Sequence, residues 1–141
     1  MEYRRFQNKI VVRMDPKEEI ISNMKEIALK EKITLAEVTA LGAVNDFTVG
    51  VYQVDEKKYY SNHFTGSYEI VSLLGTINTM NGEFYTHLHM SCGDESGKVF
   101  GGHLNEAYVS ATVEMVISVI DGTVDRFHDE KIGLNLFQFE N

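Results

Sequence analysis

The stretch at residues 82–105 constrains the fold more than any other part of this sequence. It contains three of the five histidines and the only cysteine. Within it, D-E-S-G-K at residues 94–98 is typical of a three-residue hairpin loop, with Gly97 in the left-handed position of a bulged turn. Counting outward from that loop predicts an antiparallel pair of strands in which His89 lies opposite His103.

This register divides the predicted hairpin into a polar and an apolar face, because side chains alternate along a strand and opposed residues share a face. The loop length is decisive, since a two-residue loop would move His103 away from the other two histidines. The polar face carries His87, His89, Ser91, Gly101, His103 and Asn105. The apolar face carries Phe84, Leu88, Met90, Cys92, Phe100 and Leu104. The pattern therefore predicts that three imidazoles converge.

Three convergent imidazoles predict a site for a divalent metal, with zinc as the expected ion. Three protein ligands, with a fourth position left to water or a substrate, is the arrangement of open zinc sites, whereas structural sites usually have four ligands. The alternative is that His87, His89 and His103 are partly exposed strand residues without a ligand. Cys92 falls on the apolar face and is interpreted as a core residue. His63 and His128 are isolated in the sequence, so we interpret them as solvated or hydrogen-bonded.

Glu114 and Asn105 are candidates for orienting the metal ligands. Glu114 interrupts a very apolar strand, and a buried carboxylate must be paired, hydrogen-bonded or neutralised. It could hydrogen-bond to a histidine, or it could lie at an exposed edge or in an ion pair between subunits. Asn105 shares the predicted histidine face.

Length and composition limit the class of protein. At 141 residues the chain fits one domain, residues 1–141, that can bury a core of its own. The formal charge of −8 and the scattered basic residues disfavour direct nucleic-acid binding. A single cysteine excludes an internal disulfide and fits a reducing compartment. The sequence shows no apolar run typical of a signal peptide or a membrane span, so we expect a cytoplasmic protein.

The N-terminal part predicts one strand and one helix. Residues 9–14 (K-I-V-V-R-M) are rich in β-formers. Asp15 is a candidate N-cap, Pro16 suits the first helical position, and Glu18 completes a capping-box pattern. An apolar stripe at helical spacing follows within residues 16–31. It consists of Ile20, Ile21, Met24, Ile27 and Ala28.

From residue 34 onward the pattern predicts only strands and turns. The expected strands cover residues 36–44, 47–54, 57–64, 68–80, 107–120 and 134–139, in addition to the histidine hairpin. Turns are expected at Asn45-Asp46, at residues 65–67 and at Asn81-Gly82, and Gly75 is a candidate bulge. One helix and about seven strands predict an α+β fold with a mainly antiparallel sheet. With one helix to cover several apolar strands, a bare sheet face favours self-association.

The sequence resembles the plant-and-prokaryote-conserved (PPC) domain over nearly its whole length. The segments that carry the resemblance are L-G-A-V at 41–44, E-I-V-S-L-L-G-T-I at 69–77, H-L-H-M-S at 87–91, G-K-V-F-G-G-H-L at 97–104 and T-V-E-M-V-I at 112–117. The resemblance implies an antiparallel sheet with flanking helices, assembly as a homotrimer and an association with DNA, because plant relatives carry AT-hooks. Bacterial relatives keep the three histidines, whereas plant relatives generally lack them. This chain has no R-G-R-P-like AT-hook core.

Three functions compete at this point. The first is a stand-alone, self-associating domain that binds a divalent metal and an unidentified small molecule. The second is a metalloenzyme in which an open three-histidine metal site polarises a substrate or activates water. The third is a DNA-associated protein, which the acidic charge disfavours. A cupin would also use H-x-H, but a cupin's next motif lies on a more distant strand, and a helix at residues 16–31 fits that fold poorly.

Overall fold

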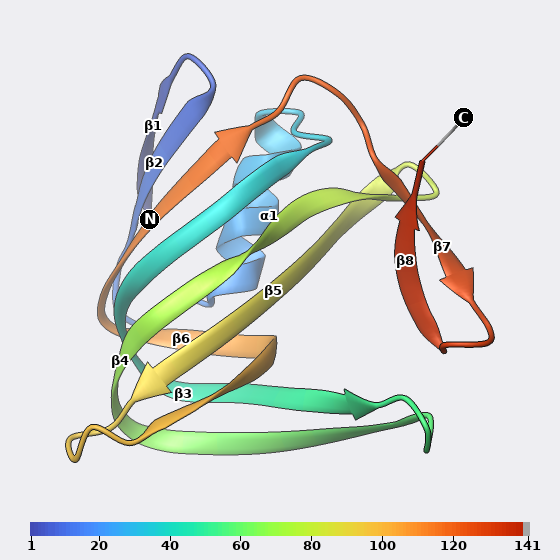
Figure 1. The fold of residues 1–141 in the computed structure, drawn as a ribbon. Helices are drawn as coiled ribbons and strands as arrows, with labels where there is room; N and C mark the ends of the chain where they lie inside the picture. Colours follow the sequence, from blue (N-terminus) through green and yellow to red (C-terminus); the bar gives the residue numbers. More distant parts are fainter. Residues whose placement is uncertain (140–141) are drawn as a thin grey trace.

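The computed structural model describes residues 1–139, which form one helix, α1 (Ile20–Lys30), and eight strands (Figure 1). The strands are β1 (Glu2–Phe6), β2 (Lys9–Met14), β3 (Ala36–Gln53), β4 (Lys58–Met80), β5 (Glu83–Gly93), β6 (Val99–Val119), β7 (Asp125–Asp129) and β8 (Leu134–Gln138). The predicted α+β class with a mainly antiparallel sheet is confirmed. None of the helices in this part of the chain is long and apolar enough to cross a membrane.

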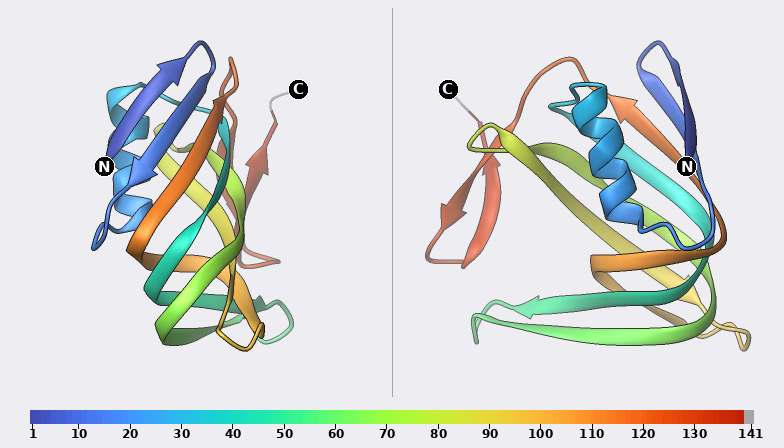
Figure 2. Two further views of the ribbon diagram at one scale, coloured as in Figure 1. Left: turned by 90° about the vertical axis from the view of Figure 1, so that its left-hand side faces the viewer. Right: turned by 180° about the vertical axis from the view of Figure 1, so that it is seen from behind.

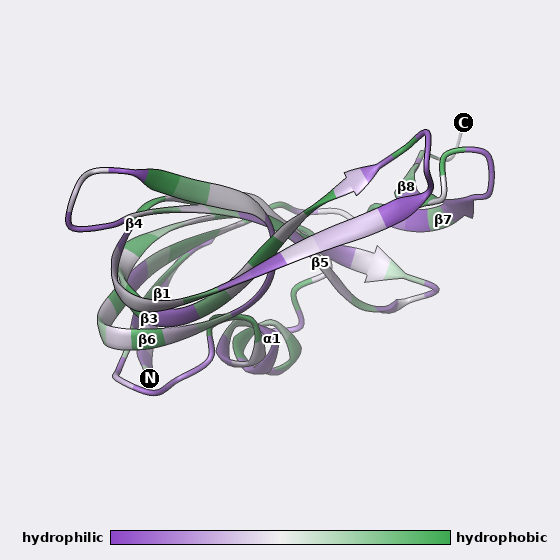
Figure 3. Cartoon of the chain, turned by 90° about the horizontal axis from the view of Figure 1, so that it is seen from below, coloured by the Kyte–Doolittle hydropathy of each residue, from purple (hydrophilic) through white to green (hydrophobic). Residues whose placement is uncertain are grey.

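The main sheet curls until its strands form a closed ring. Its order is β1-β2-β6-β3-β4-β5, and β5 pairs in addition with β6. Strands β3, β4, β5 and β6 are therefore each paired with two others of the same group, and they curve round a common interior (Figure 3). Helix α1 packs against one face of this sheet (Figure 2). Strands β7 and β8 form a separate two-stranded ribbon.

The helix buries the predicted stripe but begins later than expected. Its buried residues are Ile20, Met24, Ile27 and Ala28. The N-cap is Glu19, whose carboxylate accepts hydrogen bonds from the backbone N–H groups of residues 21 and 22. The expected start at Asp15 and Pro16 is wrong, because Lys17 has a φ of 75° and a left-handed residue interrupts a right-handed helix.

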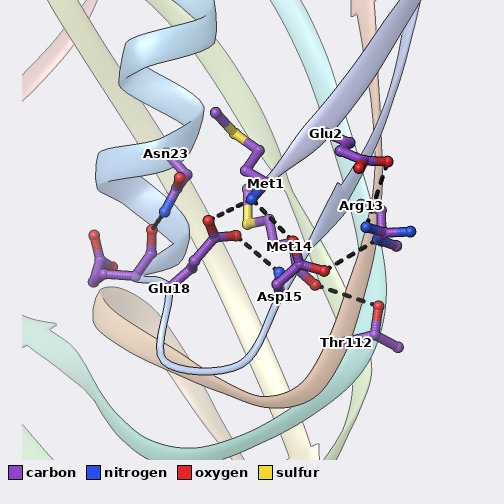
Figure 4. Close-up of polar contacts among 9 residues, drawn as sticks. Met1, Glu2, Arg13, Met14, Asp15, Glu18, Asn23 and Thr112 are labelled. Atoms are coloured by element: carbon purple, nitrogen blue, oxygen red, sulfur yellow. Dashed lines mark hydrogen bonds and ion pairs between the residues drawn. The ribbon is translucent and has the colours of Figure 1, made fainter.

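Asp15 and Glu18 nevertheless interact as a capping box would, in the turn that precedes the helix. The Asp15 N–H donates to Glu18 Oε2 at 2.8 Å. Both carboxylates also accept from the amino group of Met1, and Arg13 bonds to Asp15 from the other side (Figure 4). This network ties the first strand to the segment that leads into the helix.

Two predicted turns are bends within continuous strands. The strands expected at 36–44 and 47–54 form the single strand β3, and those expected at 57–64 and 68–80 form β4. Asn45 lies between the pairs Val44↔Tyr68 and Asp46↔Thr65. The residues of the two expected turns, 45–46 and 65–67, are therefore opposite each other in the paired strands β3 and β4. An extra residue there bends both strands without ending them.

Two strands were missed, and a further expected strand is part of a longer one. Strand β1 precedes the strand expected to be first, and the chain reverses at Gln7, where φ is 56°. Strand β7 precedes the expected last strand, which is confirmed as β8. The strand expected at 107–120 is the second half of β6, continuous with the histidine hairpin.

Aromatic rings fill the interior of the ring of strands. Phe64 lies 5.0 Å from Phe47 and 4.9 Å from Phe100 between ring centroids. Cys92 is fully buried, as predicted for a core residue, and burial raises the pKa of its thiol to about 12. A thiol with that pKa stays protonated at neutral pH and is a poor metal ligand or nucleophile.

Gly75 marks a close approach of two strands and not the expected bulge. It pairs in regular register with Val38 on β3 and with Leu88 on β5. A Cβ atom at this position would lie 2.0 Å from the carbonyl oxygen of His87. The glycine therefore lets β4 and β5 pack closely beside the histidines.

We expect Gly75→Ala to lower the free energy of unfolding by about 2–3 kcal/mol, because the added methyl group must push the His87 backbone away. Gly93→Ala is the matched control, since its Cβ would meet nothing closer than 3.4 Å. That variant should be neutral or slightly stabilising, because alanine lowers the conformational entropy of the unfolded chain. Chemical denaturation measures both, and equal losses would contradict the close-approach explanation.

Candidate metal centre

The hairpin of β5 and β6 has the predicted loop and register. His89 pairs with His103. The Asp94 N–H donates to the Lys98 carbonyl at 2.9 Å, and Gly97 adopts a φ of 79°. The three-residue loop on which the prediction depended is confirmed.

The two faces of the hairpin are sorted as the sequence predicts. On the inner face, the side chains of the core are at most 3% exposed; they are Leu88, Met90, Cys92 and Leu104. On the outer face, His87 and His89 are exposed and His103 is partly buried. The histidines thus stand on the solvent side of a strand pair whose other side is fixed by the core.

The three imidazoles lie close enough to share one ion. One ring nitrogen from each residue lies within 4.8 Å of the others. The Nε2 atoms of His87 and His89 are 3.2 Å apart. Two nitrogens bound to the same tetrahedral zinc ion at about 2.0–2.1 Å would be about 3.3 Å apart. The His87–His89 spacing and the donor type of all three residues therefore fit a divalent metal.

The surroundings favour neutral imidazoles, which is the form that binds metals. Although one side of its ring is exposed, burial of the rest of the ring, followed by the charges of His103 and His89, lowers the pKa of His87 from 6.5 to about 4. Burial and then His89 also lower the pKa of His103. Both rings therefore keep free lone pairs at neutral pH, and a cation would not have to displace their protons.

Asn105 is linked to the site indirectly, through a residue that the sequence did not indicate. Its Oδ1 accepts a hydrogen bond from Tyr59 Oη at 2.6 Å. The ring of Tyr59 meets His103 edge-on, with 6.1 Å between centroids. Tyr59 belongs to the outer half of β4, which the sequence predicted as a separate strand, so no local signal placed it here.

Glu114 lies away from the histidines. It is exposed, and its neighbours in the two adjacent ladders are Arg13 and Leu41. No hydrogen bond joins it to His87, His89 or His103 among the described contacts. The interpretation of Glu114 as an edge residue is wrong, because β6 is paired on both sides at this position. An ion pair between subunits stays a prediction.

The other two histidines have separate partners. His63 Nε2 lies 2.9 Å from Asp46 Oδ1, and His128 Nδ1 lies 2.9 Å from Asn135 Oδ1. Both are exposed and hydrogen-bonded, as the sequence predicted.

Arg126 is a further residue beside the site that sequence reasoning missed. It lies on β7 and is only 6% exposed. Its guanidinium stacks on the rings of Tyr85 and Phe137, at 4.7 and 4.3 Å from their centroids. Tyr85 precedes His87 by two residues on β5, and the charge of Arg126 also contributes to the lowered pKa of His87. No sequence pattern indicated Arg126, because its position beside the site depends on how the β7–β8 ribbon packs against the sheet.

Comparison with known proteins agrees with the fold and the motifs. The family model described as the Plants and Prokaryotes Conserved (PCC) domain matches residues 1–121. The chain belongs to this family. A search of curated proteins gave no match.

Solved structures of similar proteins cover almost all of this PPC-domain chain. A Bacteroides thetaiotaomicron protein, whose name proposes DNA binding, is 26% identical, with a TM-score of 0.96 and coverage of 99% of this chain and 98% of the other. A metal-containing protein from Archaeoglobus fulgidus is 28% identical, with a TM-score of 0.86 and coverage of 98% and 97%. A PPC protein from Pyrococcus horikoshii is 29% identical, with a TM-score of 0.84 and coverage of 99% and 95%.

We expect the metal-free protein to lose stability as the pH falls from about 6.5 toward 4. The folded state holds the pKa of His87 below its unfolded value, so the unfolded chain binds more protons in this window. One such group changes the free energy of unfolding by at most about 1.4 kcal/mol per pH unit, and by less here because the ring is partly open to solvent.

The measurement is urea denaturation at several pH values between 7 and 5. His87→Gln should flatten the dependence of the unfolding free energy on pH, whereas His63→Gln, outside the cluster, should not. An unchanged slope in His87→Gln would show that the imidazole cluster does not control acid sensitivity.

Proposed function

We propose that this PPC-domain protein binds one divalent metal ion per chain, with zinc as the expected ion, through His87, His89 and His103. The observation that carries the proposal is the convergence of three imidazole nitrogens within 4.8 Å on one face of a rigid hairpin. The lowered pKa values of His87 and His103 support it, because they favour the ligating form. The name of the similar Archaeoglobus fulgidus protein, which is metal-containing, supports it independently.

The ligand set leaves room for a further molecule. Three protein ligands are one fewer than a closed structural zinc site uses. A metal held in this way can polarise a bound group or activate water, so a metalloenzyme is the second candidate function. In either case the chain's own part is to hold three imidazoles on a paired strand hairpin and to keep one side of the site accessible.

We further propose that the protein self-associates, as a homotrimer, through the outer face of the sheet. Val11, Leu41, Val71 and Leu74 expose between 47% and 60% of their surface there. Leu74 lies directly opposite His89 in the β4–β5 ladder, so this apolar face reaches the metal site. Exposed apolar surface of this kind favours burial against another copy.

Direct DNA binding has less support. The formal charge is −8, and contacts to phosphate groups depend on clustered lysine and arginine. The name of the Bacteroides thetaiotaomicron protein proposes DNA binding for that protein, which is 26% identical to this one. We therefore retain the expectation of negligible affinity for duplex DNA at physiological salt.

Zinc should raise the melting temperature of the wild-type protein. A hundredfold excess over the dissociation constant corresponds to about 2.7 kcal/mol of added stability. His89→Ala should abolish this gain, because two imidazoles hold the ion weakly. His63→Ala and His128→Ala should keep it, since both residues lie outside the cluster and have other partners. Thermal melts with and without zinc decide the assignment, which is wrong if the wild type shows no shift or if His63→Ala loses the shift as fully as His89→Ala.

Light scattering should give the mass of a trimer, and Leu74→Glu should shift it toward the monomer, because the charge would be buried without a partner. Leu29→Glu is the matched control, as Leu29 is 58% exposed on the helix and Leu74 is 54% exposed on the sheet. A wild-type monomer throughout the micromolar range would refute the assembly. An equal effect of both variants would refute the assigned face.

A further inference from the structure

We propose that Arg126 forms the anion-recognising part of the histidine site, so that the small molecule bound there carries an oxyanion, either a carboxylate or a phosphate group. The β7–β8 ribbon holds this residue on the side of the sheet where the three imidazoles stand. Because the oxyanion would occupy the space beside the bound metal, this inference rests on the metal site proposed above.

The position of Arg126 follows from the docking of the ribbon on β4 and β5. The segment before β7 is fixed to the end of β4, where the Thr79 N–H and Asn78 Nδ2 donate to the Val124 carbonyl, each at 3.4 Å. The guanidinium then lies over the ring of Tyr85. Tyr85 and His87 are alternate residues of β5, so their side chains share a face with a spacing of about 7 Å along the strand.

Within residues 1–139, the charge of Arg126 is buried without an ion-pair partner. The side chain is 6% exposed, and none of the ion pairs within residues 1–139 includes it. Its surroundings are the two aromatic rings and two neutral acceptors. Nε donates to Asn78 Oδ1 at 3.1 Å, and Nη1 donates to the Asn135 carbonyl at 2.7 Å. Burial of an unpaired charge is costly, which points to an anionic partner that is not part of the described chain.

The guanidinium still has donors to offer such a partner. It carries five N–H groups, of which the two contacts above use two. The other three, on the η nitrogens, have no acceptor among the described hydrogen bonds. A planar guanidinium binds the two oxygens of a carboxylate or phosphate side by side. An oxyanion would therefore satisfy both the charge and the unused donors.

A purely structural role would explain the packing of Arg126 but not its unused donors. The aromatic contacts and the bonds to Asn78 and Asn135 fasten the ribbon to the sheet. The two aromatic rings offset part of the cost of burying the cation, but they do not accept the three N–H groups that are left on the η nitrogens. The two roles are separable by experiment, because fastening affects stability whereas recognition affects anion affinity.

The test is calorimetric titration of the zinc-loaded full chain with succinate and with inorganic phosphate. We expect the wild type to bind at least one probe, and the stronger one identifies the oxyanion as carboxylate or phosphate. Arg126→Gln should weaken that binding by about tenfold or more, because hydrogen bonds to a charged group are lost. Its zinc affinity without anion should stay within about twofold of the wild type, a difference well under 1 kcal/mol.

Two further variants separate recognition from fastening. Arg126→Lys keeps the charge but loses the planar fork, so we expect anion affinity to fall about threefold to tenfold. Tyr85→Phe keeps the ring under the guanidinium and removes only the hydroxyl that accepts from Asn135 Nδ2 at 3.3 Å. It should bind the anion as the wild type does. If Arg126→Gln does not fold, an unchanged anion affinity in Arg126→Lys overturns the proposal.

The outcomes also distinguish this inference from the proposed function. Normal zinc uptake together with equal anion affinity in wild type and Arg126→Gln overturns the role of Arg126 and leaves the metal site standing. Failure of the zinc-loaded wild type to bind either probe has the same consequence. Failure of the wild type to take up zinc overturns the metal site and, with it, this inference.

Discussion

The hydrogen bonds that close the loop between β5 and β6 are the constraint on which both the core and the histidine cluster depend. Asp94 Oδ1 accepts from the N–H groups of Ser96 and Lys98 at 2.8 and 3.0 Å, and Gly97 supplies the left-handed residue. A shift of one residue would move every side chain of one strand to the other face. Leu104 would then leave the core as His103 entered it, so the energy that packs the core also selects the arrangement of the imidazoles.

The histidine cluster stands where the ring of strands closes. His103 pairs with His89 on β5 and with Gly50 on β3, so one residue of β6 joins both neighbours. Glycine is required beside it, because a Cβ on Gly102 would lie 2.4 Å from the Gly50 carbonyl oxygen. Side chains placed on such a paired backbone need little reordering when they bind an ion, which favours precise binding sites on strands over those on loops.

The sequence predicted the parts of the fold that depend on residues close to one another along the chain. The hairpin register follows from loop length and the buried helix stripe from spacing, and both are local. Asn45 and Gly66 were misread because a polar residue or glycine can make either a turn or a bulge, and the choice depends on the partner strand. Tyr59 reaches the site because β3 and β4 form a long hairpin, and Arg126 reaches it because the β7–β8 ribbon packs beside β5. Their positions depend on contacts between distant segments, which a single sequence does not encode as a pattern.

Assembly and ligand binding are coupled if both proposals hold, because Leu74 and His89 are direct neighbours on the outer face. A second copy covering the apolar side of that face would also cover one edge of the histidine cluster and exclude water from it. Excluding water lowers the local dielectric constant and strengthens the attraction between a cation and an anion. The metal and the guanidinium of Arg126 would both gain from this, so the affinity for an oxyanion would depend on assembly even though all four protein groups belong to one chain.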